Sequence, residues 1–209
     1  MAAEDILDLV YEGDLEGVKQ AVEEYGSHIL HCFNYLFLFT TLHQACRSGS
    51  LPMVQYLVEN GVMVEFPDST GETALHVAIE EGHLEIVQYL EAHGANIHMH
   101  ARDGVVPATH RIGRVERSPL QIASYHGHES IVKYLVEERE ADINYRNFLG
   151  HTALDEARTK GHADVVNYLE RVDKVRKCHS LIGFLLKRGF WDKKDLKRKS
   201  QNYQLDCQS

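Results

Sequence analysis

Apolar residues recur with a helical period over most of this chain, and the pattern is clearest in the segment 68–96. Leu75 and Ala78 are three residues apart, so they lie on one face of a helix. Ile86 and Leu90 are four residues apart and share a face in the same way. The segment therefore predicts two short helices, each with one apolar side that can pack against a neighbour.

Polar and glycine residues mark the ends of both predicted helices. Thr73 places a hydroxyl where it can accept a hydrogen bond from a main-chain N–H of the first turn. Gly82 follows the first helix and Gly94 follows the second, and glycine most easily takes the left-handed conformation that ends a helix. The segment thus reads as one complete unit of helix, link and helix.

The spacing of this unit recurs along the chain, which indicates an internal repeat. Leu42 precedes Leu75 by 33 residues, Leu120 follows it by 45, and Leu154 comes 34 residues after Leu120. The longest interval holds a Gly- and Pro-containing stretch, which we interpret as an exposed loop inserted between two repeats. Residues 4–26 keep the spacing but are more acidic, as expected for a first repeat with one face in water.

The segments TALHVA, EEGHLEIVQYL and GAN follow one another in the clearest unit. Together they closely resemble an ankyrin repeat, a turn plus two antiparallel helices of about 33 residues. The resemblance implies an all-α fold, an ankyrin-repeat solenoid of stacked helix-turn-helix units with an additional C-terminal helix. The predicted repeat domain spans 1–172, with units at about 4–36, 37–67, 68–100, 113–146 and 147–172 and an insertion near 100–112. A C-terminal capping helix at 173–191 and a basic flexible tail at 192–209 are expected to follow.

The segment 27–41 is the least regular part of the predicted array. It carries aromatic residues at alternate positions, Phe33, Tyr35, Phe37 and Phe39. Such an alternation is compatible with a β-strand. Two interpretations of these rings stay open: they fill the core of the irregular segment, or they form part of a binding surface.

The formal charge of −9 is unevenly distributed along the chain. Residues 187–209 carry seven Lys or Arg against three Asp, so the excess of negative charge lies in the body of the protein. An acidic body repels phosphates, and nucleic acid is therefore not an expected partner. With no apolar leader and no run of roughly 18 apolar residues, the chain is expected to be intracellular. A cytoplasmic location is expected first, and the basic run KRGFWDKKDLKRK is also compatible with a nuclear one.

Fourteen histidines and four cysteines raise the question of a metal or catalytic site. His28, His31 and Cys32 have ligand-like spacing but no fourth ligand nearby, so we expect no metal, no cofactor and free thiols. The sequence also lacks a Gly-rich phosphate loop and a GxSxG motif, so no catalytic residue is assigned and no enzyme activity is expected. The resemblance implies structural roles for the histidines at the Thr-x-Leu-His and Gly-His sites: His43, His76, His83, His128 and His162.

The resemblance implies that the chain recognises another protein. In ankyrin repeats the partner lies along the concave side, which the turn tips and the first helices form. Alignment of the units places residues rich in Tyr, Phe and Arg on this side, and these types are enriched at the centres of interfaces. The candidate protein-binding residues are Tyr11, Phe37, Phe39, Arg47, Glu72, Glu80, Glu81, Arg114, Arg117, Tyr125, His126, Phe148, His151 and Lys160.

A second interpretation assigns the specific contact to the C-terminal segment. Residues 181–191 are mostly apolar, contain Trp191, and are followed by Lys and Arg. Such a segment can rest on an anionic membrane surface or contact a second protein, which would make the chain an interfacial or regulatory adaptor. The sequence leaves the oligomeric state and the identity of the partner open.

Overall fold

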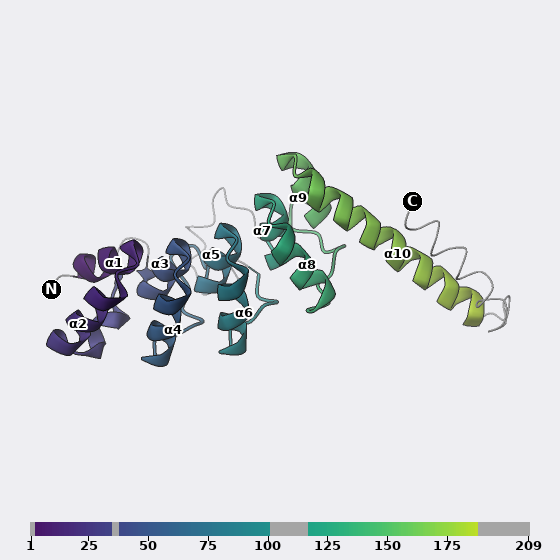
Figure 1. The fold of residues 1–209 in the computed structure, drawn as a ribbon. Helices are drawn as coiled ribbons and strands as arrows, with labels where there is room; N and C mark the ends of the chain where they lie inside the picture. The colour runs from purple at the N-terminus through teal and green to yellow at the C-terminus, as the bar shows by residue number, and fades with distance from the viewer. Residues whose placement is uncertain (1–2, 35–37, 101–116, 188–209) are drawn as a thin grey trace.

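The computed structural model describes residues 3–34, 38–100 and 117–187 of the chain (Figure 1). Within these residues the protein is an all-α solenoid of helix pairs, which confirms the predicted fold class. Several predicted features lie outside the described residues: Phe37, Arg114, the insertion after residue 100, and the tail at 192–209.

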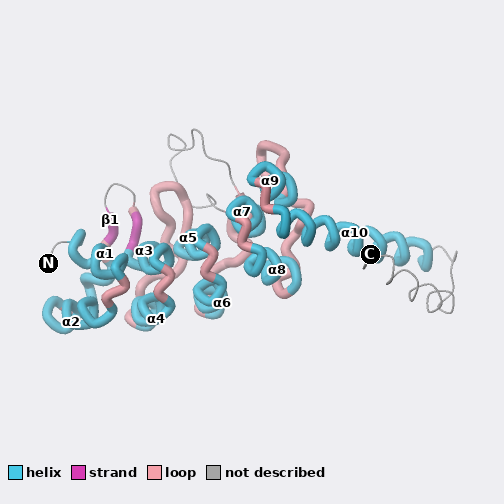
Figure 2. The backbone as a smooth tube through the Cα atoms, turned by 45° about the horizontal axis from the view of Figure 1, so that its top comes forward, coloured by secondary structure: helices cyan, strands magenta, loops and turns pink. Residues whose placement is uncertain are grey.

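The helices form two layers, and each repeat contributes one helix to each layer (Figures 1 and 2). Helices of the first layer contact one another in chain order along the array. The first layer holds α1 (Ala3–Glu12), α3 (Thr41–Ser48), α5 (Ala74–Glu81), α7 (Pro119–His126) and α9 (Ala153–Lys160). The second layer holds α2 (Leu15–Tyr25), α4 (Leu51–Glu59), α6 (Leu84–Ala92), α8 (Glu129–Glu137) and α10 (Ala163–Lys187).

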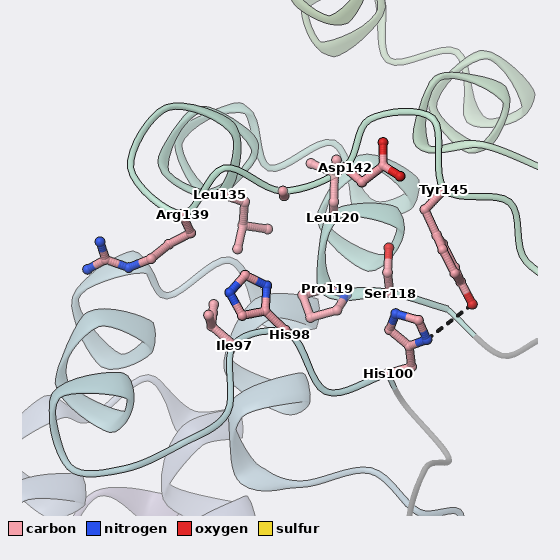
Figure 3. Close-up of a pocket in the computed structure, with 11 residues that line it drawn as sticks. Ile97, His98, His100, Ser118, Pro119, Leu120, Leu135, Arg139, Asp142 and Tyr145 are labelled. Carbon is pink, nitrogen blue, oxygen red and sulfur yellow. Dashed lines mark hydrogen bonds between the residues drawn. The ribbon is translucent and has the colours of Figure 1, made fainter.

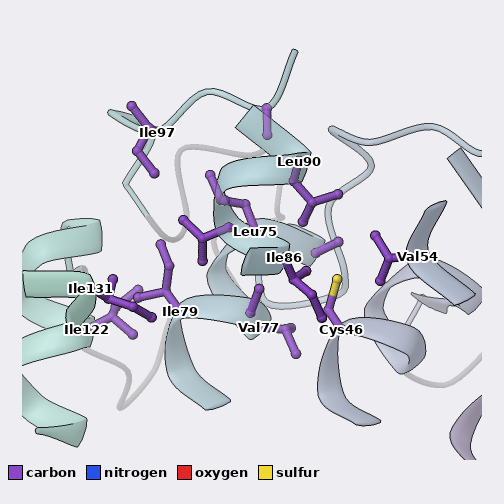
Figure 4. Close-up of a cluster of buried hydrophobic side chains, with 14 of the residues drawn as sticks. Cys46, Val54, Leu75, Val77, Ile79, Ile86, Leu90, Ile97, Ile122 and Ile131 are labelled. Atoms are coloured by element: carbon purple, nitrogen blue, oxygen red, sulfur yellow. The ribbon is translucent and has the colours of Figure 1, made fainter. Parts of the chain in front are cut away.

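One continuous apolar core runs between the two layers and from repeat to repeat. Leu75 is only 1% exposed, and Figure 4 shows it beside Ile86 and Leu90 of its own repeat. Val54 of the second repeat and Ile131 of the fourth lie on either side of this repeat (Figure 4). Leu154 of the fifth repeat is only half-buried and packs against the core. The other corresponding residues are buried, as the predicted register requires: Leu42, Leu57, Leu120, Leu135, Ala157 and Leu169.

A capping box begins each of the helices α3, α5, α7 and α9. In α5 the main-chain N–H of Thr73 donates to Nδ1 of His76 at 3.1 Å, which confirms Thr73 as the cap. The same helix ends at Gly82, which has the predicted left-handed conformation. The other three boxes pair Thr40 with His43, Ser118 with Gln121, and Thr152 with Asp155.

In three of the capping boxes the third helical residue also bonds to a distant carbonyl: His43 and Gln121 reach the next repeat, and His76 reaches the end of its own repeat. Because Nδ1 of His76 accepts a main-chain hydrogen bond, its Nε2 carries the proton and donates to the carbonyl of Met99 at 2.9 Å. A carboxylate has no N–H, so Asp155 caps its own helix but makes no such link. The links that reach the next repeat run from Nε2 of His43 to the carbonyl of Glu72 (3.1 Å) and from Nε2 of Gln121 to the carbonyl of His151 (2.7 Å).

The Gly-His histidines join consecutive repeats at the opposite ends of the first helices. Nε2 of His128 lies 2.7 Å from the carbonyl of Glu80, and Nε2 of His162 lies 2.9 Å from that of Tyr125. The ring of His83 lies against Gly49 in the same way. These contacts agree with the structural role predicted for the three histidines.

Protonation of His43 is expected to destabilise the fold. Burial lowers the pKa of His43 below its ordinary value, because the charged ring would lose its hydration. The imidazole of the unfolded chain then binds a proton near pH 6.5, whereas that of the folded chain binds one only at lower pH. The free energy of unfolding therefore falls as the pH drops below about 6.5. In the His43→Gln variant the amide can make both bonds, as Gln121 does in its repeat. Urea unfolding at about pH 7.5 and 5.5 should show a smaller loss for this variant than for the natural chain. An equal loss of stability in both chains would show that His43 is not the source of the pH dependence.

The C-terminal helix differs from the prediction. Instead of a separate capping helix at 173–191, the second helix of the fifth repeat continues without a break as α10 to Lys187. The helices α4, α6 and α8 are each followed by a residue with a positive φ, namely Gly61, Gly94 and Glu140. No glycine follows Leu169 at the corresponding position, and α10 continues through it. Arg176 then holds the continuation against α8, because its guanidinium donates to the carbonyls of Val136 (3.4 Å) and Ala141 (3.3 Å).

The fourth repeat is one residue longer than the third at the end of its second helix. The closing hydrogen bond runs from Ala95 to Leu90 in the third repeat but from Ala141 to Leu135 in the fourth. Glu140 precedes Ala141 and has a φ of 52°, a conformation that costs a side-chain-bearing residue about 1–2 kcal/mol. This loop accounts for the interval of 34 residues between Leu120 and Leu154.

Replacement of Glu140 by glycine is therefore expected to stabilise the protein by about 1 kcal/mol, because glycine takes this conformation without a steric penalty. The matched control is Glu138→Gly, two residues earlier, where φ is −102° and glycine offers no relief. The midpoint of urea unfolding should rise for the first variant and fall for the second. A fall for both would show that the Glu140 backbone is not strained.

The irregular segment contains a short helix and a small sheet. Ser27–His31 forms a 3-10 helix (η1), and β1 (Phe33–Asn34) pairs antiparallel with β2 (Phe39–Thr40). The β-strand suggested by the aromatic alternation is thus present at both ends of the aromatic run but not over Ser27–His31. Phe39 packs partly against the core, with its ring centre 4.9 Å from that of His43.

Candidate functional site

Two sets of positions on the first layer carry most of the predicted binding residues. One set is the residue just before each capping residue: Phe39, Glu72, Arg117 and His151. The other is the pair just before the glycine that follows each helix: Tyr11 with Glu12, Arg47 with Ser48, Glu80 with Glu81, Tyr125 with His126, and Thr159 with Lys160. We call these positions together the first-helix surface.

At the second and third repeats, this surface is built from an aromatic ring, a cation and a carboxylate. The guanidinium of Arg47 lies over the ring of Phe39, 4.6 Å from its centre. Nε of Arg47 lies 3.6 Å from a carboxylate oxygen of Glu81 on the next helix. Both charged side chains are exposed enough that the ion pair contributes at most about 1 kcal/mol, so its main effect is to orient Arg47.

Glu80 and His126 join the third repeat to the fourth. Nε2 of His126 lies 3.7 Å from a carboxylate oxygen of Glu80. Burial lowers the pKa of His126, although the neighbouring Glu80 acts in the opposite direction. The imidazole is therefore neutral at pH 7, and the contact becomes an ion pair only in acid.

Tyr125 of α7 lies between two cations. The guanidinium of Arg117 is 4.2 Å from the centre of the ring, and Nζ of Lys160, from the fifth repeat, is 4.3 Å from it. Cations are attracted to aromatic faces by about 0.5–1 kcal/mol at exposed sites. The ring of Tyr125 therefore positions two positive charges.

A buried carboxylate holds the other side of Arg117. Nε of Arg117 lies 3.5 Å from a carboxylate oxygen of Glu156, which also accepts a hydrogen bond from the amide of Asn147 at 3.2 Å. Nδ1 of His151 lies 3.7 Å from the same oxygen. Glu156 and Asn147 are both buried, so they fix this part of the surface from below.

Nine of the predicted residues and Glu156 thus take part in the contacts described above, which extend over the second to fifth repeats. Two steps along this row, from Glu81 to Glu80 and from His126 to Tyr125, join residues that are adjacent in the sequence. Tyr11 stands apart at the first repeat and is 55% exposed, and Phe148 is exposed at the tip of a turn in the fifth. The carbonyl of Glu72 accepts the link from His43. Glu156 and Asn147 were not predicted. Asn147 aligns with Asp68 of the third repeat, and this alignment could have marked Asn147 as a turn residue.

A cleft of about 140 Å³ opens between the third and fourth repeats, at the base of the insertion (Figure 3). Two of its polar groups already contact other side chains: Tyr145 Oη lies 3.1 Å from Nδ1 of His100, and Nε of Arg139 lies 2.6 Å from a carboxylate oxygen of Glu91. Ligand sites commonly occupy about 300–1,000 Å³, so the cleft is small for one. We therefore base the functional argument on the first-helix surface.

Within the residues that the structure describes, no group of three His, Cys, Asp or Glu side chains could hold a metal ion. Cys32, Cys46 and Cys178 are free thiols. No helix in the described part of the chain is long and apolar enough to span a membrane.

Stacked helix pairs of this kind define a solenoid repeat protein, a class of proteins that present extended binding surfaces. The sequence matches the family described as ankyrin repeats (3 copies), over residues 6–103 and 98–178. This chain therefore belongs to the ankyrin repeat family. Ankyrin repeats are in general non-catalytic modules for protein–protein interaction.

Curated relatives match over short segments. The chain is 48% identical over 52 residues to probable E3 ubiquitin-protein ligase XBOS33 of Oryza sativa subsp. japonica, which is 25% of this chain and 10% of that protein. It is 38% identical over 64 residues to BCL-6 corepressor-like protein 1 of Mus musculus, covering 31% and 4% of the two chains. It is 34% identical over 64 residues to putative glutaminase 2 of Caenorhabditis elegans, covering 31% and 11%. The matched segments span about a tenth or less of these relatives.

Proposed function

We propose that this chain is a non-enzymatic adaptor that binds a partner protein through the first-helix surface. The observation that carries the proposal is the sequence of contacts from Phe39 to Lys160, which joins residues of four repeats. Side chains that are already held in place lose little conformational entropy on binding. The geometry therefore supports recognition of a folded or extended protein segment that contacts several repeats at once.

Charge reversal on this surface tests the proposal. The variant Arg47→Glu/Lys160→Glu changes both ends of the contact sequence, whereas Lys19→Glu/Lys174→Glu makes the same change in net charge on α2 and α10. Proteins captured from an extract by the natural chain should bind the first variant at least about tenfold more weakly, which corresponds to 1.4 kcal/mol. The control variant should bind as the natural chain does. Equal capture by both variants, with both folded by circular dichroism, would refute the proposed surface.

A second candidate function rests on the length of α10. It has 25 residues, whereas α4, α6 and α8 have nine each, so it extends well past the repeat that it completes. This extension supports a role for the C-terminal segment in contacting a membrane or a second protein. Removal of residues 188–209 distinguishes the two: unchanged partner binding favours the first-helix surface, and lost binding or lost vesicle association favours the segment.

A further inference from the structure

The turns that precede α5 and α9 have the same geometry but very different tips. In the third repeat the side chain of Asp68 accepts from the N–H groups of Thr70 (2.7 Å) and Glu72 (3.0 Å). In the fifth, the side chain of Asn147 accepts from those of Leu149 (3.1 Å) and His151 (3.0 Å). The same two main-chain bonds close both turns, and a glycine with φ near 80° follows each tip.

The two residues at the tip are Ser69 and Thr70 in the third repeat and Phe148 and Leu149 in the fifth. Phe148 is 66% exposed and Leu149 is 52% exposed, so neither side chain is needed for the core. The third repeat shows that the turn forms equally well with small polar tips. An adjacent pair of large apolar side chains, held outward on a hydrogen-bonded turn, is a feature that folding does not explain.

Two cations, Arg146 and Lys160, flank this part of the chain, which also carries the half-buried carboxylate of Asp155. Arg146 is exposed beside the apolar tip and donates to the carbonyl of Gly150 at 2.6 Å, while Lys160 rests on Tyr125. Within the described residues, neither Arg146 nor Lys160 forms an ion pair with a carboxylate. The contacts from His151 through Glu156 and Arg117 to Tyr125 connect the turn, which precedes α9, to Lys160 at the end of this helix. One extended partner segment that follows α9 could therefore contact the tip and both cations.

The third repeat, in contrast, carries negative charge alone. Residues 48–101 contain eight Asp or Glu and no Lys or Arg, and Glu80 and Glu81 lie on the first-helix surface there. A partner carboxylate is therefore repelled from the third repeat, whereas the fifth offers it Arg146 and Lys160. This asymmetry restricts where, along the array, an acidic partner can bind.

We propose that the turn 147–151, together with Arg146 and Lys160, binds an acidic segment of a partner protein that places an apolar side chain on Phe148 and Leu149. The inference rests on the proposed function, because His151 and Lys160 belong to the first-helix surface and the inference assigns a chemical class to the partner of that surface. The apolar contact supplies the anchor, and the two cations select carboxylates close to it in the partner.

The test uses the full chain and a displayed library of short random peptides as the probe. Phe148→Ser/Leu149→Thr installs the tip of the third repeat in the fifth and should leave the melting temperature unchanged. Peptides enriched on the natural chain should combine Asp or Glu with a large apolar residue, and should bind this variant and Lys160→Glu at least about tenfold more weakly. Ser69→Ala/Thr70→Ala is the matched control on the other turn and should bind them normally.

A reciprocal variant separates the apolar tip from its charged surroundings. Ser69→Phe/Thr70→Leu, added to the Phe148→Ser/Leu149→Thr chain, restores an apolar tip but among carboxylates, so it should not restore binding. Enriched peptides that are basic, or that bind Phe148→Ser/Leu149→Thr normally, would overturn the inference, as would a library that yields no binder. Peptides that bind Phe148→Ser/Leu149→Thr normally but bind Arg47→Glu/Lys160→Glu weakly would overturn this inference and still support the proposed function. Binding that is indifferent to both variants would contradict both.

Discussion

Replacement of Leu75 by alanine is expected to lower the free energy of unfolding by about 2 to 5 kcal/mol, the range for a buried leucine. Leu75 is in the middle of the array and contributes to the apolar core that its repeat shares with both neighbours (Figure 4). The cavity left behind would be lined by groups of three repeats, which cannot all move inward. Urea unfolding monitored by circular dichroism measures the loss. Leu120, equally buried in the fourth repeat, should behave alike.

Gln88 on the outer side of α6 provides the control, since it is exposed and its replacement by alanine should change stability by less than about 0.5 kcal/mol. A loss of that small size for Leu75→Ala would mean that the register of the core is wrong. Because repeat arrays are stabilised between neighbours, the loss can unfold one end before the other. Two separate transitions in the unfolding curve would reveal this.

Replacement of Gly82 by alanine is expected to cost about 2 to 3 kcal/mol, from backbone strain together with a lost hydrogen bond. Gly82 has a φ of 86°, and an added Cβ would lie 2.6 Å from Nδ1 of His128. The ring would have to move and would lose its bond to the carbonyl of Glu80. The measurement is again the free energy of urea unfolding.

Gly161 offers a matched control for the strain alone. It ends α9 with a φ of 79°, but an added Cβ would meet nothing within 4 Å. Gly161→Ala should therefore cost only the conformational part, about 1–2 kcal/mol. The double variant Gly82→Ala/His128→Ala should lose less free energy of unfolding than the two single variants lose together, because each substitution removes the same contact. Strict additivity would show that the ring of His128 does not oppose a side chain at residue 82.

The local features of the fold were predictable because single residues specify them. The cap at Thr73, the end at Gly82 and the burial of Leu75 follow from positions a few residues apart. The continuation of α10 was not anticipated, although the absence of a glycine after Leu169 was visible in the sequence. What holds the continuation is the contact of Arg176 with α8, and contacts over 35 residues or more leave no local pattern.

The candidate surface was predictable as a set of positions but not as a set of contacts. Alignment of the repeats places Tyr125 and Lys160 on corresponding helices, yet the approach of Lys160 to the Tyr125 ring depends on side-chain conformations. Glu156 was missed because a glutamate in a short helix usually faces water. Its burial arises from Arg117 and Asn147, which come from two other parts of the chain.

The long-range bonds made by three of the four capping boxes give the array a rigid middle and a looser C-terminal end. The third repeat accepts a bond from His43 and is closed at its own end by His76, whereas Asp155 bonds only within its own capping box. Amide protons of α5 should thus exchange with deuterium more slowly than those of α9, where local opening needs fewer broken contacts. A ligand bound to the fifth repeat would slow the exchange of amide protons in α9, which exchange rapidly without ligand. Deuterium uptake would therefore report occupancy of that end with high contrast, even for a weakly bound partner.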